Sequence, residues 1–187
     1  QKFNNDFKSP DFLRTPEPLI QKEFSRIMSL KDGMKKMSKS DPSDLSRINL
    51  TDTKEQISNK IKKAKTDPLP MPSDKNNLSQ RPEAENLLGI YSSLTSQTIE
   101  KSINQFSGKN FSEFKERLAE VLVERISPIS KEIKKLLQDE KYIDHILLEG
   151  SQKADIIASQ KIKKIKELIG FWPIILISLN FSIIDYI

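Results

Sequence analysis

The sequence predicts a mainly α-helical protein, in which an antiparallel helical bundle follows a short α/β segment. Apolar residues recur at helical spacing through most of the chain after Asp52. Residues that cap or open helices stand before several of these stretches. One short apolar run that fits a buried strand, Phe24–Leu30, precedes them. These observations divide the chain into residues 1–51, residues 52–170 and an apolar tail, residues 171–187.

The N-terminal segment combines a predicted strand with a basic loop. The apolar run Phe24–Leu30 ends at a Lys-Asp-Gly sequence, which favours one buried strand of a parallel sheet. The following residues, Gly33–Pro42, are rich in lysine and serine and have no periodic apolar face. They therefore predict a loop.

Helix starts can be placed from the residues that favour them. Thr53 and Gln56 have the spacing of a capping box, and Pro82 suits the first position of a helix. Asn110 is the predicted cap of a long helix, whose apolar stripe begins at Phe111. We expect Pro128 to break or kink this helix, with the stripe continuing beyond it to Leu137.

The last predicted helix runs from about Tyr142 to Leu168 and is also amphipathic. Gly150 and Ala154 fall on its apolar face, where small side chains would let a neighbouring helix approach closely. This face completes the predicted bundle.

Composition restricts the chemistry of the chain. No cysteine is present, which excludes disulfides and thiolate metal sites and fits a reducing, cytoplasmic location. Lys and Arg number 31 against 26 Asp and Glu, so the net charge of +5 suits a polyanionic partner. The chain starts at Gln1 and its first methionine is Met28, so we expect it to begin inside a longer protein. The polar start, Gln1–Arg14, does not fit a signal peptide.

The tail, residues 171–187, differs sharply in composition from what precedes it. It has no lysine or arginine and is shorter than the ~20 apolar residues that a membrane-spanning helix needs. Pro173, Asn180 and Asp185 also interrupt it. We interpret it as an aberrant segment foreign to the fold, with a membrane anchor as the less favoured alternative.

Several motifs together resemble one enzyme family. Lys36–Ser40 reads KMSKS, Arg26–Leu30 reads RIMSL, and Asp41-Pro42 follows the first motif. Further similar segments are Pro16–Ile20, Ile57–Asp67, Arg81-Pro82 with Glu85–Tyr91, Phe111–Lys115, and Glu149-Gly150 with Lys153-Ala154. From about Phe3 to Gly170 the chain resembles the tryptophanyl-tRNA synthetases, which are class I aminoacyl-tRNA synthetases. The HxGH motif of that class is absent, because the single histidine is His145.

The resemblance implies an activity, tryptophan–tRNA ligation, and a place for this chain in it. Residues 1–51 would be a remnant of a Rossmann-like nucleotide-binding catalytic domain, and residues 52–170 an anticodon-side helical domain. Lys36 and Lys39 would be catalytic, because their ammonium groups can bind the pyrophosphate that leaves ATP. The implied ATP-binding residues are Ile27, Lys36, Met37, Ser38, Lys39 and Ser40.

The implied partners are ATP with Mg²⁺, tryptophan, tRNA(Trp) and a second subunit, since the family forms homodimers. No residue is predicted as a metal ligand, and no membrane association is expected. Because the HxGH segment and the tryptophan pocket are missing, we expect the isolated chain to be inactive.

Alternatives remain for these residues. The chain also fits a non-catalytic helical RNA-binding module or a decayed remnant, and the lysine-rich loop taken by itself fits a solvated surface loop. His145 fits a surface or boundary position. Two lysine clusters fit either solvated helix faces or contacts with the tRNA backbone; they are Lys60, Lys62, Lys63 and Lys65, and Lys161, Lys163, Lys164 and Lys166.

Overall fold

The computed structural model describes residues 1–20, 24–76 and 78–171. The chain forms two compact units: residues 19–140 make up the larger, and residues 1–18 with the chain from residue 141 onward the smaller. Apart from Phe171, the predicted aberrant tail lies outside the described residues.

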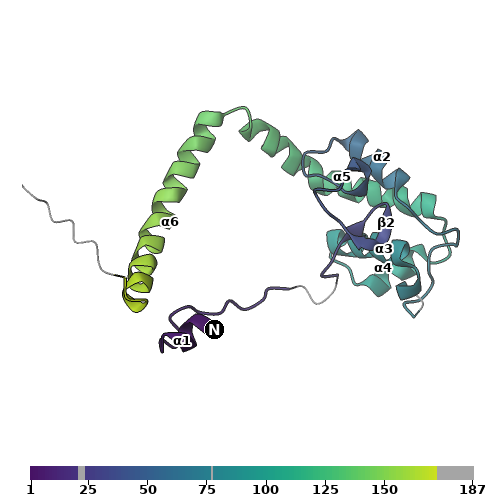
Figure 1. The fold of residues 1–187 in the computed structure, drawn as a ribbon. Coiled ribbons are helices and arrows are strands. Elements are labelled where there is room, and N and C mark those ends of the chain that lie inside the picture. Colours follow the sequence, from purple (N-terminus) through teal and green to yellow (C-terminus); the bar gives the residue numbers. More distant parts are fainter. Residues whose placement is uncertain (21–23, 77, 172–187) are drawn as a thin grey trace, which may run out of the picture. The chain divides into compact units, whose positions relative to one another are not determined.

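The mainly helical prediction is confirmed (Figure 1). The larger unit contains β1 (Met28–Ser29), β2 (Asp32–Lys36), η1 (Asp44–Ser46), α2 (Lys54–Lys63), η2 (Leu78–Gln80), α3 (Pro82–Thr95), α4 (Ile99–Phe106) and α5 (Phe111–Leu136). The smaller unit contains α1 (Lys2–Asp6) and almost all of α6 (Glu140–Leu168).

The predicted helix starts are also confirmed. The Thr53 hydroxyl oxygen accepts a hydrogen bond from the Gln56 amide at 3.2 Å, and the Thr53 amide donates to Gln56 Oε1 at 2.7 Å. This is the reciprocal capping box at the start of α2. Pro82 is the first residue of α3, and Asn110 Oδ1 accepts from the Glu113 amide at 2.8 Å at the start of α5.

The predicted parallel strand is wrong. Only Met28–Ser29 of the Phe24–Leu30 run is strand, and it pairs in an antiparallel hairpin with β2, which takes up the first part of the predicted loop. Met28 lies opposite Lys36, and Ser29 opposite Asp32. The Lys-Asp-Gly sequence lies at a turn between two strands: Lys31 is the second residue of a two-residue connection, and Asp32 begins the return strand. A connection of this length allows only antiparallel pairing.

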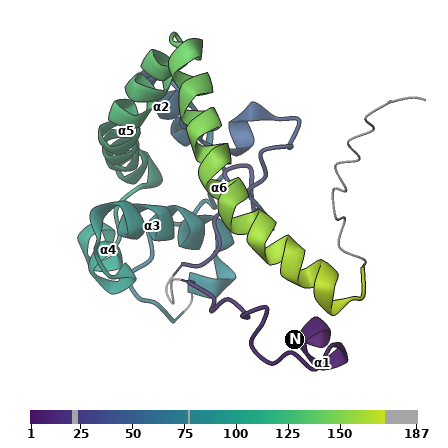
Figure 2. The same ribbon diagram turned by 90° about the vertical axis from the view of Figure 1, so that its left-hand side faces the viewer.

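The core of the larger unit lies where α2 and α3 pack against α5, with α4 beside α3 (Figure 2). At its centre the rings of Tyr91, Phe106 and Phe114 meet edge to face, with centroids 4.8 to 5.9 Å apart. Such edge-on contacts add to the free energy gained by burying the rings. Ile57 and Ile61 of α2 are buried in the same cluster.

Two predictions for the second half of the helical part are not confirmed. Pro128 does not break α5, which runs on to Leu136, while a kink at Pro128 stays a prediction. The expected continuation of the apolar stripe is exposed at Ile129. Among the described residues of α6 none is buried, and a Cβ built on Gly150 would meet nothing within 4 Å. An amphipathic pattern predicts a helix, but it does not by itself supply a partner. The antiparallel bundle is therefore not confirmed for α6, almost all of which belongs to the other unit.

The smaller unit is joined by contacts between the start of the chain and α6. Lys161 Nζ donates to the Phe12 carbonyl at 2.9 Å and lies 4.3 Å from the centroid of the Phe12 ring. The ring of Phe12 in turn stacks on Phe3, with centroids 6.1 Å apart. None of the helices within the described ranges is long and apolar enough to span a membrane.

Candidate functional site

The β1–β2 hairpin brings the predicted ATP-binding residues together. The Met37 amide donates a hydrogen bond to the Ile27 carbonyl at 3.0 Å, directly beyond the pairing of Met28 with Lys36. Ile27 and the lysine loop, which we define as Lys36–Ser40, are thus neighbours across the hairpin. Sequence spacing alone did not predict this arrangement, because we had expected a parallel strand followed by an irregular loop.

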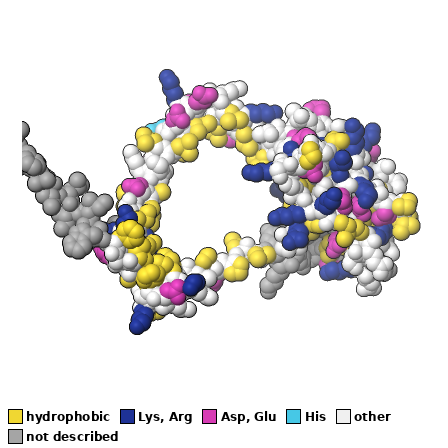
Figure 3. Space-filling view, viewed as in Figure 1, with side chains coloured by type: hydrophobic (Ala, Val, Ile, Leu, Met, Phe, Trp, Pro, Cys, Tyr) yellow, Lys and Arg dark blue, Asp and Glu magenta, His cyan; other side chains and the backbone are white. Residues whose placement is uncertain are grey.

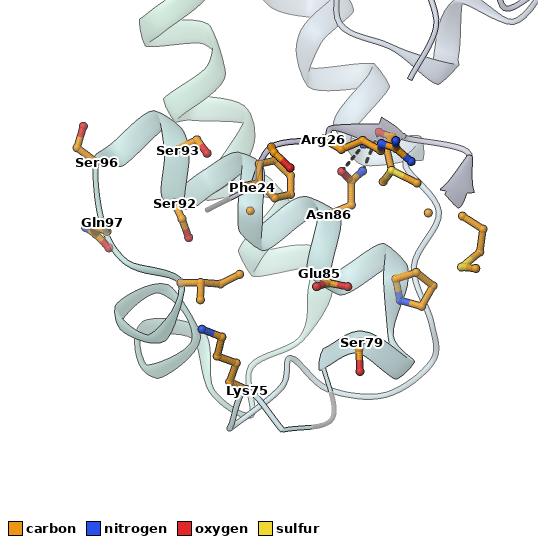
Figure 4. A pocket seen from close by; sticks show the side chains of 17 residues that line it. Phe24, Arg26, Lys75, Ser79, Glu85, Asn86, Ser92, Ser93, Ser96 and Gln97 are labelled. Carbon is orange, nitrogen blue, oxygen red and sulfur yellow. Dashed lines mark hydrogen bonds between the residues drawn. The ribbon is translucent and has the colours of Figure 1, made fainter. Parts of the chain in front are cut away.

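An asparagine on α3 holds the hairpin in place. The Met28 amide donates to Asn86 Oδ1 at 2.9 Å, and Asn86 Nδ2 donates to the Met28 carbonyl at 2.9 Å (Figure 4). Only 2% of Asn86 is exposed. A side-chain amide carries both a donor and an acceptor, so Asn86 pairs with β1 much as a neighbouring strand would. Sequence reasoning missed this role, although a polar residue directly before Leu87 and Leu88 was a usable signal.

The hairpin backbone also lies directly on the first turn of α3. A Cβ at Gly33 would stand 2.7 Å from the backbone nitrogen of Glu83, so only glycine allows this approach. Lys65 Nζ lies 2.8 Å from Glu83 Oε1 at the same place. The hydrogen bond from Lys65 is the main reason why the pKa of the Glu83 carboxyl is lowered.

The two predicted catalytic lysines project from this fixed base. Lys36 and Lys39 are exposed, and across the described ranges neither ammonium group has a hydrogen-bond or ion-pair partner. Met37 lies between them and packs against the hydrophobic core. The loop therefore presents two unneutralised cations, with an apolar side chain anchoring it.

The two serines of the lysine loop contact each other. Their hydroxyl oxygens, Ser38 Oγ and Ser40 Oγ, are 3.0 Å apart, and the Ser40 amide donates to Ser38 Oγ at 3.3 Å. Both residues are exposed, so their hydroxyl groups are accessible to a ligand that could replace this contact.

A cavity of about 790 Å³ lies beside the hairpin, but the lysine loop does not line it (Figure 4). Its wall includes Arg26 and Met34 of the hairpin region and Glu85 and Asn86 of α3. The predicted site residues Ile27 and Lys36–Ser40 are not among its lining residues. The predicted catalytic groups are thus exposed and lie outside this cavity.

One lysine of the predicted RNA-contacting clusters is not available to a ligand. Lys60 is 2% exposed, and its Nζ lies 2.7 Å from both Asp44 and Asp52. Treating Lys60 as part of a solvated, RNA-facing surface is therefore wrong, because its charge is used inside the fold. Lys62 and Lys63 are exposed, as is His145. In the part of the chain that the structure describes, no three His, Cys, Asp or Glu residues are grouped so that they could hold a metal ion.

One known family matches most of the chain. The family model described as tRNA synthetases class I (W and Y) matches residues 1–127. The chain belongs to this family. The hairpin and the lysine loop lie within the matched part of this class I tRNA synthetase chain.

The relatives of this class I tRNA synthetase chain are tryptophan–tRNA ligases. The one from Caulobacter vibrioides is 48% identical over 172 residues, which are 92% of this chain and 50% of the relative. The one from Agrobacterium fabrum is 51% identical over 155 residues, or 83% of this chain and 44% of the relative. The chain therefore spans about half the length of the curated relatives that it matches.

A solved structure supports the fold. The tryptophanyl-tRNA synthetase from Mycoplasma pneumoniae matches with a TM-score of 0.75 and 26% sequence identity, over 91% of this chain and 50% of that one. The enzyme from Campylobacter jejuni, solved with ADP and tryptophan, matches with a TM-score of 0.60 at 23% identity. The second likeness concerns the fold alone.

Proposed function

We propose that this chain is the C-terminal part of a tryptophan–tRNA ligase and that it supplies the lysine loop to the ATP site. The observation that carries the proposal is the hairpin, which sets Ile27 beside Met37 while the ammonium groups of Lys36 and Lys39 stand exposed and unpaired within the described structure. Identity near 50% to tryptophan–tRNA ligases supports the choice of amino acid.

The reaction has two steps. The carboxylate of tryptophan attacks the α-phosphorus of ATP, and the bond to pyrophosphate breaks as tryptophanyl-adenylate forms. Negative charge then accumulates on the leaving oxygens, where Lys36 and Lys39 stabilise it and Ser38 and Ser40 donate hydrogen bonds. Ile27 and Met37 contact the nucleotide. In the second step a hydroxyl of the terminal tRNA ribose takes the acyl group and releases AMP.

Mg²⁺ would be bound by the ATP phosphates and not by this chain. The lysine loop offers ammonium and hydroxyl groups, and neither is a preferred Mg²⁺ ligand. The neighbouring Asp41 carboxylate accepts a hydrogen bond from the Ser43 amide at 2.8 Å. The residues of the loop therefore fit a Mg²⁺ ion that is bound by the nucleotide.

The proposal also covers the rest of the chain. Residues 1–51 belong to the catalytic domain and residues 52–170 to a helical domain that contacts tRNA(Trp), while residues 171–187 take no part. The whole enzyme would act as a cytoplasmic homodimer. The exposed Lys62 and Lys63 on α2 are the candidates for contacts with the RNA backbone.

A chimaera tests this function. The N-terminal half of the Caulobacter vibrioides relative is joined to this chain, and tryptophan-dependent ATP–pyrophosphate exchange is measured. We expect exchange by the chimaera and none by the chain alone. Lys39→Ala should lower the rate by about 10²–10³-fold, the usual effect of removing one group that stabilises transition-state charge.

The matched control is Lys35→Ala, at a lysine of β2 just before the lysine loop. Lys35 is exposed and lies 3.8 Å from Asp32, so its loss should change the exchange rate less than about twofold. Full exchange by a Lys36→Ala, Lys39→Ala double variant would overturn the proposed mechanism. Binding of tRNA without any exchange would instead favour the non-catalytic RNA-binding module.

A further inference from the structure

The chain is held to the rest of the fold on both sides of Ser38–Ser40, whereas the hydrogen bonds of Ser38–Ser40 themselves are local. At the start, the Met37 amide donates to the Ile27 carbonyl at 3.0 Å. At the far end, Arg47 Nη1 donates to the Asp41 carbonyl at 2.9 Å and to the Ser43 carbonyl at 3.4 Å. Ser38–Ser40, with Lys39 at its centre, therefore lies between two fixed points.

The Arg47 guanidinium is itself held on its other edges. Its Nε donates to Asn49 Oδ1 at 3.1 Å, and its Nη2 lies 3.3 Å from Asp44 Oδ1. The side chain is largely covered, with 18% of its surface exposed. A planar guanidinium with several donors can join backbone carbonyls to two side chains in one fixed geometry.

The network continues from Asn49 into the interior. Asn49 Nδ2 donates to Asp44 Oδ1 at 2.9 Å and to Asp52 Oδ1 at 3.3 Å. Lys60, on α2, places its Nζ 2.7 Å from Asp44 Oδ2 and 2.7 Å from Asp52 Oδ2. The hydrogen bond from Lys60 is the main cause of the lowered pKa of the Asp44 carboxyl.

A buried ion pair is seldom retained for stability alone. Desolvation of Lys60 and Asp52, of which 2% and 5% are exposed, offsets much of their mutual attraction. Such a pair can instead fix the positions of the side chains around it. Here Asp52 accepts a hydrogen bond from Asn49, Asn49 accepts one from Arg47, and Arg47 donates to the Asp41 carbonyl.

We propose that Arg47 is a positioning residue for the lysine loop, held in place by the buried Lys60–Asp52 pair through Asn49. The guanidinium fixes the Asp41 carbonyl. The motion of Lys39 is therefore limited to what the short segment between Met37 and Asp41 allows. The restraint on the loop stands on the contacts described here. Its consequence for pyrophosphate departure rests on the proposed function.

Hydrogen–deuterium exchange of the full chain tests the restraint without requiring activity. In Arg47→Gln, amides of residues 38–46 should exchange about tenfold faster, because one charged hydrogen-bond donor no longer holds the loop end. The amides of α3 and α5 should keep their rates. Arg47→Lys retains one cationic donor and should restore part of the protection. Arg117→Gln, which removes an exposed arginine paired with Glu120 on α5, is the matched control.

The network from α2 needs its own variant. Lys60→Met would leave the buried Asp52 carboxylate without its cation and could fail to fold, so Asn49→Ala is used to interrupt the route from Asp52 to Arg47 instead. It should raise exchange in residues 38–46 in the same direction, although Asp44 still joins Lys60 to Arg47. Unchanged exchange in Arg47→Gln would overturn the positioning role, and unchanged exchange in Asn49→Ala alone would overturn the link through Asn49.

The catalytic consequence is measured in the chimaera. Arg47→Gln should lower kcat for ATP–pyrophosphate exchange about tenfold while leaving the KM for tryptophan unchanged. Faster deuterium exchange with an unaltered kcat would overturn the catalytic consequence and leave the restraint standing. A chimaera without any exchange would count against the proposed function and not against the restraint.

Discussion

The helices of the larger unit and the long helix α6 share an amphipathic pattern but differ in what they bury. The first part of α5 buries Phe114, Leu118 and Val121 in the core. In contrast, α6 has no buried residue among those described, although it is the longer helix, with 29 residues against 26. Hydrophobic side chains gather along its surface (Figure 3). The spacing of apolar residues therefore predicts the helix, whereas burial of its apolar face depends on a neighbouring element that packs against it.

The same difference appears within α5 itself. Its stripe is buried as far as Ile126 and exposed at Ile129 and Leu136, although the helix is continuous. The buried part faces α2 and α3, which pack against α5. The change occurs without any break in helical structure. It shows that burial here follows from the neighbouring elements and not from helix propensity.

The largest expected contrast comes from cutting back one apolar side chain in each region. Phe114→Ala should lower the free energy of unfolding by about 3–5 kcal/mol, because the ring is 0% exposed and meets Tyr91 and Phe106 edge to face. Ile157→Ala should change it by less than about 0.5 kcal/mol, since this side chain is 73% exposed. Urea unfolding followed by circular dichroism measures both. A comparable loss in the two variants would mean that α6 is packed in solution.

Glycine substitutions make a smaller contrast. A Cβ at Gly89 on α3 would lie 2.0 Å from Cε2 of the Phe24 ring, so Gly89→Ala should displace the ring and cost about 1–3 kcal/mol. At Gly150 on α6 nothing lies within 4 Å, and Gly150→Ala should stabilise the helix by about 0.5–1 kcal/mol. Thermal unfolding checks both values. In a Phe24→Ala background the cost of Gly89→Ala should largely disappear, and an unchanged cost there would exclude the ring as its cause.

The smallest effect is a difference in pH dependence. The pKa of Glu83 is lowered below its ordinary value of 4.5, chiefly by the hydrogen bond from Lys65. The pair therefore stabilises the fold above that value, and the contribution is lost as the pH falls through the lowered pKa. Unfolding free energies at about pH 7 and about pH 3 should differ less in Glu83→Gln than in the parent chain.

The control for that measurement lies on α6. Glu149 pairs with Lys153 at 2.6 Å, but both side chains are well exposed, so solvent screens the interaction. Glu149→Gln is therefore the matched variant. If Glu83→Gln left the difference between the two pH values as it is in the parent chain, the Lys65–Glu83 pair would have no measurable part in stability.

Local chemistry could be predicted from the sequence, because its signals lie close together along the chain. Thr53 with Gln56, Pro82 and Asn110 each favour a helix start by themselves, and each stands where it was expected. The KMSKS residues likewise pointed to one family, to which the chain belongs. The sequence did not predict that the chain turns back after Leu30 into an antiparallel strand. A two-residue connection is too short to have a distinctive composition.

Long-range roles were the part that sequence could not supply. Asn86 forms hydrogen bonds with Met28 of β1, 58 positions away in the sequence. Lys60 has the sequence context of a solvated lysine, and only the structure shows that it pairs with Asp44 and Asp52. A polar residue beside buried positions of a helix can signal that it needs a partner, as at Asn86, but the sequence does not say which residue that partner is. For the same reason the roles of Arg47 and Asn49 became evident only from their contacts.

The β1–β2 hairpin has a consequence for how copies of this chain behave at high concentration. Within the described residues β2 pairs only with β1, but the first turn of α3 lies against Gly33 and the Met34 amide donates to Asp32 Oδ1 at 3.0 Å, so only a short stretch of its outer edge is open to pairing with a strand from another molecule. Met34 on this strand is well exposed and would favour such pairing, whereas Lys35 and Lys36 beside it carry like charges that repel a second copy. The two lysines thus also oppose aggregation, an effect that is separate from any interaction of theirs with phosphate.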